Sequence, residues 1–432
     1  MFKMNKDILR KVIEIERRHT KWRSNCLNMI AAENVSSPSV RKRLSSDFGC
    51  RYVNAYAPTL ATDWKAFEEV EWYEGLDYIQ EVERLCHGLL KKLFNAKYAD
   101  YRPISGSAAI LANWLALTDV GDTIVTTHEY DGGHGPGWDE SAVLMGRKIE
   151  HWPFDSREFV IDVEKAKKQI DQIKPKLLVF GASQILFPAP LKELKSAADE
   201  IGAYCVFDGS HVMGLLAGKR LQDPLREGAL TLFGSTHKTF PGPQGGLIVS
   251  NAEEAILRKL DRTLDPSLFD NYHQHRVAAL TVAIAEMLEF GEKYADQVIR
   301  NAKALGQALA EEGFTVVGAH KGFTETHQIL LDVRPLNREG KEATKALSSC
   351  NIITNKVHLP GDPEEKFGGM RLGASEMSRT GMKEKDMKDV ARVFRKCLID
   401  RVDRKRVKKE VMELKRAFKK VYYSFDKGLS AY

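Results

Sequence analysis

The sequence predicts an α/β protein, with a large domain built on a mixed, mostly parallel sheet and a smaller α+β domain after it. The main observation is that short apolar runs alternate with helix-like segments between residues 74 and 290. Such runs are typical of strands buried on both faces, as in parallel sheets. The second observation is the length of 432 residues, which indicates two or three domains. We therefore expect an N-terminal arm over 1–73, a large domain over 74–290 and a small domain over 291–432.

The elements of the arm and the large domain follow from the spacing of apolar residues. The arm should begin with a helix over 6–22 and continue as an irregular stretch. The apolar runs predict six strands, at 123–127, 148–152, 177–181, 204–208, 230–234 and 246–249. The segments around them predict helices at 77–94, 107–117, 162–173, 191–201 and 252–262.

Helical spacing also dominates 277–311, where the large domain passes into the small one. The small domain should then contain strands at 315–318 and 328–333, followed by helices to the C-terminus. Its last helix carries an apolar stripe at steps of four and three, formed by Val407, Val411, Leu414, Phe418 and Val421.

The C-terminal segment is also strongly basic. From Arg401 to Tyr432 there are eleven Lys or Arg residues against four Asp or Glu, whereas the whole chain has a net charge of +6. The simplest interpretation is a helix docked on the body with its basic side chains in water. Binding of nucleic acid or of a membrane surface is the alternative.

Composition excludes several classes of protein. Hydrophobic residues make up 43% and charged residues 29%, as in ordinary soluble proteins. No apolar run reaches the ~18 residues of a membrane span, and the N-terminus has no apolar signal region. The six cysteines are scattered without a CxxC pair, which fits a reducing cytoplasm and argues against a structural zinc site. We expect no metal and no membrane partner.

The segment from Gly234 to Gly246, GSTHKTFPGPQGG, is the first that indicates chemistry. Lys238 follows a predicted strand among small and hydroxyl residues. Lysines are rarely buried without a partner, and a desolvated lysine is a good nucleophile for Schiff-base formation with a carbonyl group. The alternative is a surface turn in which Lys238 faces water.

Asp208 stands at the carboxyl end of another predicted strand, where parallel sheets bind ligands. A carboxylate there can keep the ring nitrogen of a pyridine aldehyde cofactor protonated. His211 follows three residues later and can support the same site. The alternatives are a capping role for Asp208 and an ordinary polar role for His211.

Two further segments fit such a cofactor. Ser105, Gly106 and Ser107 precede a helical run, and the N-terminus of a helix binds phosphate through its free N–H groups. His134 lies in the glycine-rich loop DGGH and can stack on a planar ring. Read singly, the serines are ordinary helix caps and His134 is a loop histidine. Together with Lys238 and Asp208, they supply the groups that pyridoxal 5′-phosphate (PLP) requires.

The order and context of these groups resemble the serine hydroxymethyltransferase family. The resemblance extends from Asn28-Met-Ile-Ala-Ala-Glu-Asn34 to Met370-Arg-Leu-Gly-Ala374, and Ser-Thr-His-Lys-Thr followed by Gly-Pro-x-Gly-Gly is specific to that family. It implies the PLP-dependent fold type I of the aspartate-aminotransferase kind, and a homodimer with shared active sites. It also implies an amino-acid substrate and an aldehyde as partners.

The resemblance implies roles for single residues. Lys238 would hold the cofactor, with His237 beside it, and His134 would stack on the ring. Asp208 would contact the ring nitrogen, while His211 and Ser183 would lie at the side of the cofactor. Arg371 would bind the amino-acid carboxylate. The remaining implied groups are the phosphate loop Ser105, Gly106 and Ser107 and two tyrosines, Tyr52 and Tyr73, that reach the site from the partner subunit.

The sequence departs from the family pattern mainly where the family binds folate. Asn54 stands in Tyr52-Val-Asn-Ala-Tyr56, at the place of a glutamate that in the family contacts folate and transfers protons. An amide cannot act as an acid or a base in this proton transfer. Ala32 replaces a serine near the substrate carboxylate, and Gln244 replaces an arginine. His273 and His275 lie where a Gly-Gly-Pro segment normally helps to hold the partner's phosphate. The use of tetrahydrofolate is therefore doubtful.

These departures favour a folate-independent aldol reaction. We expect cleavage or formation of 3-hydroxy amino acids through a glycine quinonoid, as in a threonine aldolase or transaldolase. The alternative is a serine hydroxymethyltransferase that uses tetrahydrofolate or a modified pterin. A second alternative is a PLP-binding scaffold without activity, whose basic tail binds nucleic acid; the retained Lys238, Asp208 and Arg371 argue against it.

Overall fold

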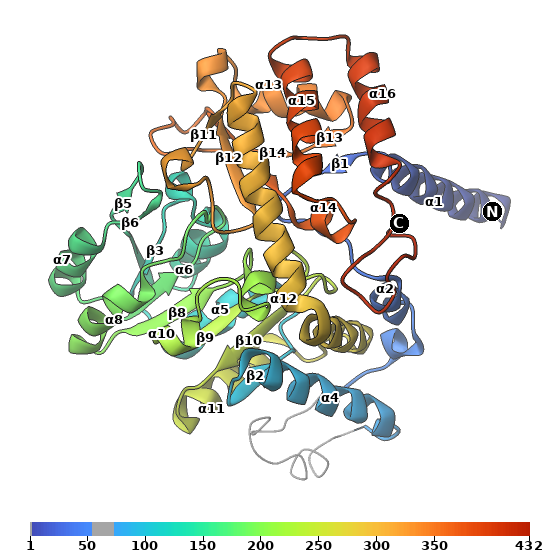
Figure 1. Ribbon diagram of the computed structural model, residues 1–432. Coiled ribbons are helices and arrows are strands. Elements are labelled where there is room, and N and C mark those ends of the chain that lie inside the picture. The colour runs from blue at the N-terminus through green and yellow to red at the C-terminus, as the bar shows by residue number, and fades with distance from the viewer. Residues whose placement is uncertain (1, 54–72) are drawn as a thin grey trace.

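A computed structural model of the chain describes residues 2–53 and 73–432 (Figure 1). Its largest sheet has seven strands in the order β2-β10-β9-β8-β7-β3-β4. The neighbours from β9 to β4 are parallel, whereas β10 is antiparallel to both β9 and β2. The strands are β2 (Tyr98–Asp100), β3 (Thr123–Thr126), β4 (Lys148–His151), β7 (Leu177–Phe180), β8 (Tyr204–Asp208), β9 (Thr231–Ser235) and β10 (Gly246–Ser250).

Helices cover both faces of this sheet. Along β7, Leu177 and Val179 belong to one hydrophobic cluster, with α5 (Gly106–Leu117) and α11 (Glu254–Arg262). Leu178 and Phe180 belong to the other, with α7 (Val163–Ile173) and α8 (Leu191–Glu200). Because side chains alternate along a strand, a continuous apolar run supplies both clusters. This explains why the apolar runs in the sequence predicted the strands.

A smaller antiparallel sheet follows, in the order β11-β12-β15-β14. Its strands are β11 (Thr315–Val316), β12 (Gln328–Asp332), β14 (Asn355–Val357) and β15 (Gly369–Gly373). The helices of this region are α13 (Gly340–Ser349), α14 (Ser375–Arg379), α15 (Met387–Leu398) and α16 (Arg404–Lys415). The expectation of helices alone after residue 333 is therefore wrong, since β13 (Ile352–Ile353), β14 and β15 lie there.

The long helix α12 (Gln274–Glu311) links the two sheets (Figure 1). It contacts α4 (Asp77–Phe94), α2 (Pro38–Leu44) and α9 (Met213–Ala217) near the large sheet, and α15, β11 and β12 near the small one. The fully buried side chains of α12 include Val277, Leu280, Ile284, Val298 and Leu305. These side chains belong to one hydrophobic cluster that extends from the large sheet to the small one.

The first helix, α1 (Phe2–Arg23), extends away from the body of the molecule (Figure 1). Several of its large apolar side chains are more than half exposed, namely Ile8, Leu9, Val12 and Ile15. The stretch after it was expected to be irregular but contains α2 and the two-residue strand β1 (Leu27–Asn28), which pairs with β13. The short strands β5 (Phe154–Asp155) and β6 (Val160–Ile161) form a separate hairpin.

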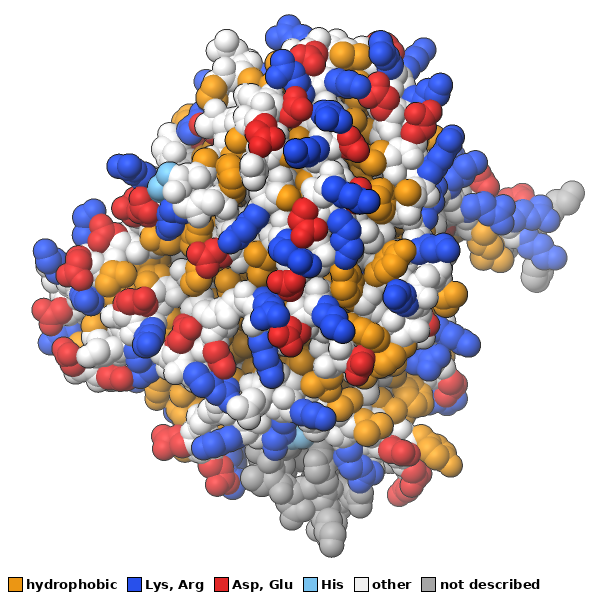
Figure 2. All heavy atoms as spheres, viewed as in Figure 1, with side chains coloured by type: hydrophobic (Ala, Val, Ile, Leu, Met, Phe, Trp, Pro, Cys, Tyr) orange, Lys and Arg blue, Asp and Glu red, His pale blue; other side chains and the backbone are white. Residues whose placement is uncertain are grey.

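The basic C-terminal segment docks on the body as the simplest interpretation expected, although its helix ends earlier. Val407 and Val411 of α16 are buried, whereas Phe418 and Val421 lie beyond the end of the helix. The chain turns back there, with a bridge between Lys420 and Ser430. Figure 2 shows Lys and Arg side chains interspersed with Asp and Glu on the face of the molecule in view. Within the described ranges, no helix is long and apolar enough to cross a membrane.

Candidate active site

A cavity of about 230 Å³ lies at the carboxyl ends of the central parallel strands and the N-terminus of α5. Parallel sheets bind ligands at this edge, because the loops that follow the strands converge there. Its walls consist of hydroxyl, imidazole, carboxylate and amine groups with few apolar ones. The lining residues are Ser105, Gly106, Ser107, Ile110, His134, Ala182, Ser183, Asp208, Ser210, His211, Ser235, His237 and Lys238. The cavity therefore collects nearly all of the predicted cofactor residues.

Among residues 2–53 and 73–432, Lys238 is the one primary amine that lines this cavity. It stands in the turn that follows β9, and its backbone oxygen accepts a hydrogen bond from Asn34 Nδ2 at 2.8 Å. Burial lowers the pKa of the Lys238 amine to about 8; the charge of Asp208 opposes this shift, and that of Arg371 adds to it. A lowered pKa leaves a useful fraction of the amine neutral near pH 7.5, as a nucleophile requires.

Asp208 ends β8, and its carboxylate is only 6% exposed. The backbone N–H of Ser210 donates to Oδ1 at 2.9 Å, and the indole N–H of Trp138 donates to Oδ2 at 3.2 Å. Both donors hold the carboxylate in one orientation at the wall of the cavity. A buried carboxylate so placed can receive a further N–H from a ligand.

Ser105 caps the N-terminus of α5, where its Oγ accepts from Ala108 N at 3.0 Å. Gly106 follows at a point of close packing, since a Cβ on it would lie 2.3 Å from Ser235 Oγ. Only glycine fits there, so the start of the helix sits directly against the end of β9. The first N–H groups of a helix lack intrahelical partners and favour an anion, which makes this corner suitable for a phosphate.

Three histidines line the same cavity. The backbone at Gly137 packs against the ring of His134, because a Cβ there would lie 2.2 Å from His134 Cδ2. Gln328 Nε2 lies 3.1 Å from His211 Nδ1, and burial keeps the pKa of His211 well below its usual value. His237 Nδ1 is buried without a hydrogen-bond partner among the described residues, and burial with the nearby Lys238 lowers its pKa to about 4. His211 and His237 are therefore neutral near pH 7.

Arg371 enters from the small sheet, on β15. Its Nη1 donates to the backbone oxygen of Ser183 at 2.6 Å, while its Nε is buried and has no partner within the described ranges. Burial lowers the pKa of Arg371 to about 10. Its positive charge lowers the pKa of His134 and of Lys238, so the guanidinium lies within electrostatic reach of the cavity. Arg371 pairs with no carboxylate among the described residues, which suits it to an acidic ligand.

Two predicted tyrosines do not line this cavity. Tyr52 and Tyr73 contact each other, with ring centroids 5.2 Å apart, and are 39% and 44% exposed. Tyr52 Oη donates to Asp270, outside the cavity. Asn54 lies outside the described residues. Within the described ranges there is no cluster of three or more His, Cys, Asp or Glu side chains arranged to hold a metal ion.

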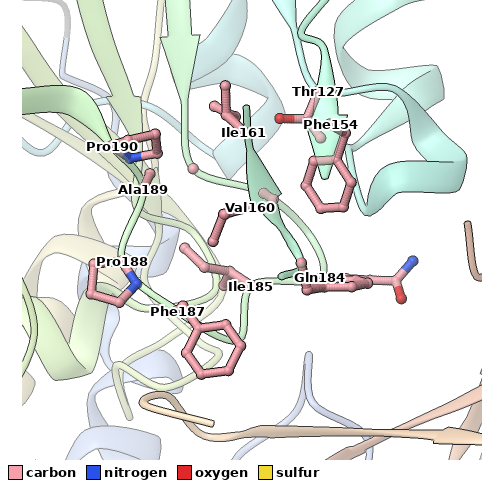
Figure 3. A pocket seen from close by; sticks show the side chains of 13 residues that line it. Thr127, Phe154, Val160, Ile161, Gln184, Ile185, Phe187, Pro188, Ala189 and Pro190 are labelled. Atoms are coloured by element: carbon pink, nitrogen blue, oxygen red, sulfur yellow. The ribbon is translucent and has the colours of Figure 1, made fainter. Parts of the chain in front are cut away.

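A second cavity of about 30 Å³ lies beside the β5–β6 hairpin (Figure 3). Its labelled side chains include Phe154, Val160, Ile161 and Ile185, and the amide of Gln184 points away from them (Figure 3). The space holds about one water molecule and offers almost no polar group. It does not suit a phosphate-bearing cofactor.

Several residues that support the cavity are not among those predicted from the sequence. Trp138 holds Asp208, and its place four residues after His134, on the same turn, was the signal that could have revealed it. Asn34 holds the backbone of Lys238, and also donates to Tyr294 Oη at 2.8 Å. His327 stacks on His211 with centroids 5.9 Å apart. These contacts join segments far apart in the sequence, so periodicity gave no indication of them.

Comparison with known proteins extends these observations. The family model described as "Serine hydroxymethyltransferase" matches residues 5–394. A curated protein of that name from Thermococcus onnurineus (strain NA1) is 46% identical over 424 residues, which are 97% of each chain. Another of that name, from Methanopyrus kandleri, is 43% identical over 98% of this chain and 96% of its own. A crystal structure of L-threonine transaldolase from Pseudomonas fluorescens in the internal aldimine state is also similar, with 30% identity, a TM-score of 0.89, and coverage of 98% of this chain and 95% of that one.

These similarities cover almost the whole chain, and they confirm the predicted α/β fold of the PLP-dependent fold type I. They also confirm that the protein is an enzyme of the hydroxymethyltransferase or aldolase type that depends on PLP, which leaves the inactive scaffold without support. The chain belongs to the serine hydroxymethyltransferase family.

Proposed function

We propose that the protein cleaves and forms 3-hydroxy amino acids at the α carbon without folate, as a threonine aldolase or a transaldolase. The observation that carries the proposal is one cavity that collects the amine of Lys238, the carboxylate of Asp208 and the helix N-terminus at Ser105. Gly106 lets the start of α5 pack against the end of β9 beside this cavity, and Lys238 has a lowered pKa, so these residues fit PLP. When bound, PLP draws electrons from the α carbon of an amino acid, so that a bond at this carbon can break.

The residues that would hold PLP come from five segments. Lys238 would bind its aldehyde carbon through Nζ, and Asp208 would accept the N–H of its ring. The phosphate would lie at the start of α5, against the hydroxyl and N–H groups of Ser105, Gly106 and Ser107. His134 would cover one face of the ring, while Ser183 and His211 would contact its side.

Other residues would act on the amino acid. Arg371 would bind the carboxylate with its planar fork of donors, and this contact decides which bond at the α carbon is oriented for cleavage. His237 Nδ1 is neutral and buried without a partner in the described structure, so it can accept a hydrogen bond from the hydroxyl group at carbon 3. Tyr73 would serve the same reaction from a second subunit.

Independence from folate is supported by the residues that differ from the family pattern. Asn54 has no acidic proton to transfer, and Gln244 lacks the positive charge of the arginine that it replaces. The solved transaldolase supports a threonine-directed reaction on this fold. The second candidate is hydroxymethyl transfer from serine to tetrahydrofolate or to a modified pterin, and the names of the curated relatives favour it.

A substrate assay separates these two candidates. The purified holoenzyme is given L-serine or L-threonine, each with and without tetrahydrofolate, and glycine and aldehyde are measured. We expect threonine to be cleaved at a rate that changes less than twofold with tetrahydrofolate. A rate with serine that exceeds the threonine rate about 10-fold and requires the folate would establish the second candidate. Asn54→Glu provides a further comparison, since it should increase the response to folate if position 54 alone limits it.

We further propose that the enzyme is a homodimer with shared active sites. The exposed apolar side of α1 supports this, because such a stripe on a projecting helix is normally covered by another surface. Tyr52 and Tyr73 support it as well, since they lie away from the cavity of their own chain while the family pattern places them in an active site. A second copy would cover α1 and receive these tyrosines.

The dimer can be tested through α1. Ile8→Asp combined with Val12→Lys places charges on the exposed apolar side, and we expect mainly monomer at about 1 μM, with activity reduced about 10-fold or more. Arg10→Asp combined with Glu14→Lys introduces the same two residue types on the polar side and should leave the dimer unchanged. Light scattering during size-exclusion chromatography gives the mass. A wild-type protein that is monomeric at 50 μM would contradict the proposal.

A further inference from the structure

Trp138 holds a position that connects two parts of the cavity. It is fully buried in the turn Pro136–Glu140, and its indole N–H donates to Asp208 Oδ2 at 3.2 Å. Asp208 Oδ1 is already held by the backbone N–H of Ser210. The indole thus supplies the second anchor of the carboxylate, and the two anchors together fix the plane of the group.

The same turn also carries His134. The backbone N–H of Trp138 donates to the oxygen of His134 at 2.9 Å, and the two rings meet edge to face with centroids 6.3 Å apart. Gly137 between them lets the imidazole lie against the backbone, where any Cβ would collide with it. A single turn therefore places both the ring-covering histidine and the donor to Asp208.

Trp114 shows that packing alone does not require this hydrogen bond. It is fully buried in the same hydrophobic cluster as Trp138, and it meets Phe233 edge to face at 6.2 Å. Its indole N–H has no partner in the described part of the chain. The fold thus accommodates a buried indole without an acceptor, whereas the N–H of Trp138 is directed at Asp208, the one carboxylate of the described chain that lines the cavity.

We propose that Trp138 is a positioning residue for the cofactor, which acts by fixing the carboxylate of Asp208 through the indole N–H. This inference rests on the proposed role of Asp208 as the acceptor of the ring N–H. With one lone pair of Oδ2 occupied by the indole, the remaining lone pairs face the cavity in a defined direction. Loss of the N–H would let the carboxylate rotate and would weaken its hold on the ring.

The test compares Trp138→Phe with Trp114→Phe. Both changes replace a buried indole by a smaller aromatic ring, but only the first removes a donor to Asp208. Apoenzyme of each variant is titrated with PLP, and the absorbance maximum of each reconstituted holoenzyme is recorded from pH 6 to pH 9. We expect Trp138→Phe to weaken PLP binding about 10-fold and to shift the absorbance, and Trp114→Phe to change binding less than twofold. Equal losses in the two variants would contradict the proposal.

A double-mutant cycle with Asp208→Ala separates positioning from a general loss of structure. If the indole acts through the carboxylate, Trp138→Phe should weaken PLP binding less than threefold once Asp208 is absent. A persisting 10-fold loss would assign Trp138 a packing role and overturn the inference. If Asp208→Ala itself binds PLP as tightly as the wild type, the proposed role of Asp208 fails, and the inference fails with it.

An independent measurement covers the case in which Trp138→Phe does not fold. The wild-type enzyme and Asp208→Ala are both labelled with ¹⁵N-tryptophan. The indole N–H resonance of Trp138 should differ between the two proteins, while that of Trp114 should not. A Trp138 resonance unaffected by this substitution would refute the contact.

Discussion

Replacing Lys238 by alanine should abolish covalent binding of PLP and lower activity about 1,000-fold or more, because no other amine of the described residues lines the cavity. The measurement has two parts. Borohydride is added to the holoenzyme to make the bond to the cofactor permanent, and peptide mass spectrometry then locates the added mass. In the variant, the absorbance of bound cofactor and the turnover of threonine are followed. We expect the mass on the peptide that contains Lys238 and on no other.

Lys415 provides the matched control within the same chain. It is also buried, and burial lowers its pKa to about 8, as for Lys238, yet it lies on α16 against Thr380 and outside the cavity. A lowered pKa alone would therefore label both lysines. Attachment to apoenzyme should also become faster as pH rises towards about 8, because Lys238 loses its proton in that range. Labelling of Lys415, or colour and turnover in Lys238→Ala, would contradict the assignment.

Replacing Arg371 by alanine should raise KM for the amino acid about 100-fold, and by lysine about 10-fold. The guanidinium has a buried Nε without a partner in the described structure and no acidic neighbour that would neutralise it. A lysine keeps the charge but cannot present two parallel donors, so it recovers only part of the binding. Steady-state kinetics with threonine measure the effect.

The control for Arg371 is a change in the substrate. An amino alcohol that lacks the carboxylate should bind equally well to the wild type and to Arg371→Lys, because the lost contact is absent from both complexes. Competition against threonine gives its affinity. If Arg371→Lys weakened the amino alcohol as much as the amino acid, Arg371 would be acting on the shape of the site, and its role as the carboxylate partner would be wrong.

The elements best predicted from the sequence are those with a local apolar pattern. The run over 204–208 coincides with β8, and the helix over 77–94 coincides with α4, because a continuous apolar run and a one-sided helix are both local patterns. β14 and β15 escaped prediction because their sequences, Asn355–Val357 and Gly369–Gly373, contain polar or glycine residues and pair with distant strands. Such pairing is decided by the whole fold.

The candidate site shows the same division. Lys238, Asp208 and Ser105 could be predicted, since each stands next to a strand or helix end that the sequence marks. The contact between Trp138 and Asp208 spans 70 positions and depends on the geometry of one irregular turn. The apolar stripe of the basic segment predicted a helix that is too long. The stripe continues past Lys415, where α16 ends and the chain turns back.

The helix α12 has a mechanical consequence for the enzyme. At 1.5 Å per residue the 38 residues of α12 give a helical path of about 57 Å. Tyr294 on this helix donates to the oxygen of Thr239, next to Lys238, and the helix also contacts β12, the strand that pairs with Arg371. The amine and the guanidinium are thus both positioned by segments that pack on the same helix. The distance between the amine and the guanidinium is therefore set by how the two sheets pack on α12. This distance limits the size of the amino acid that can contact both groups.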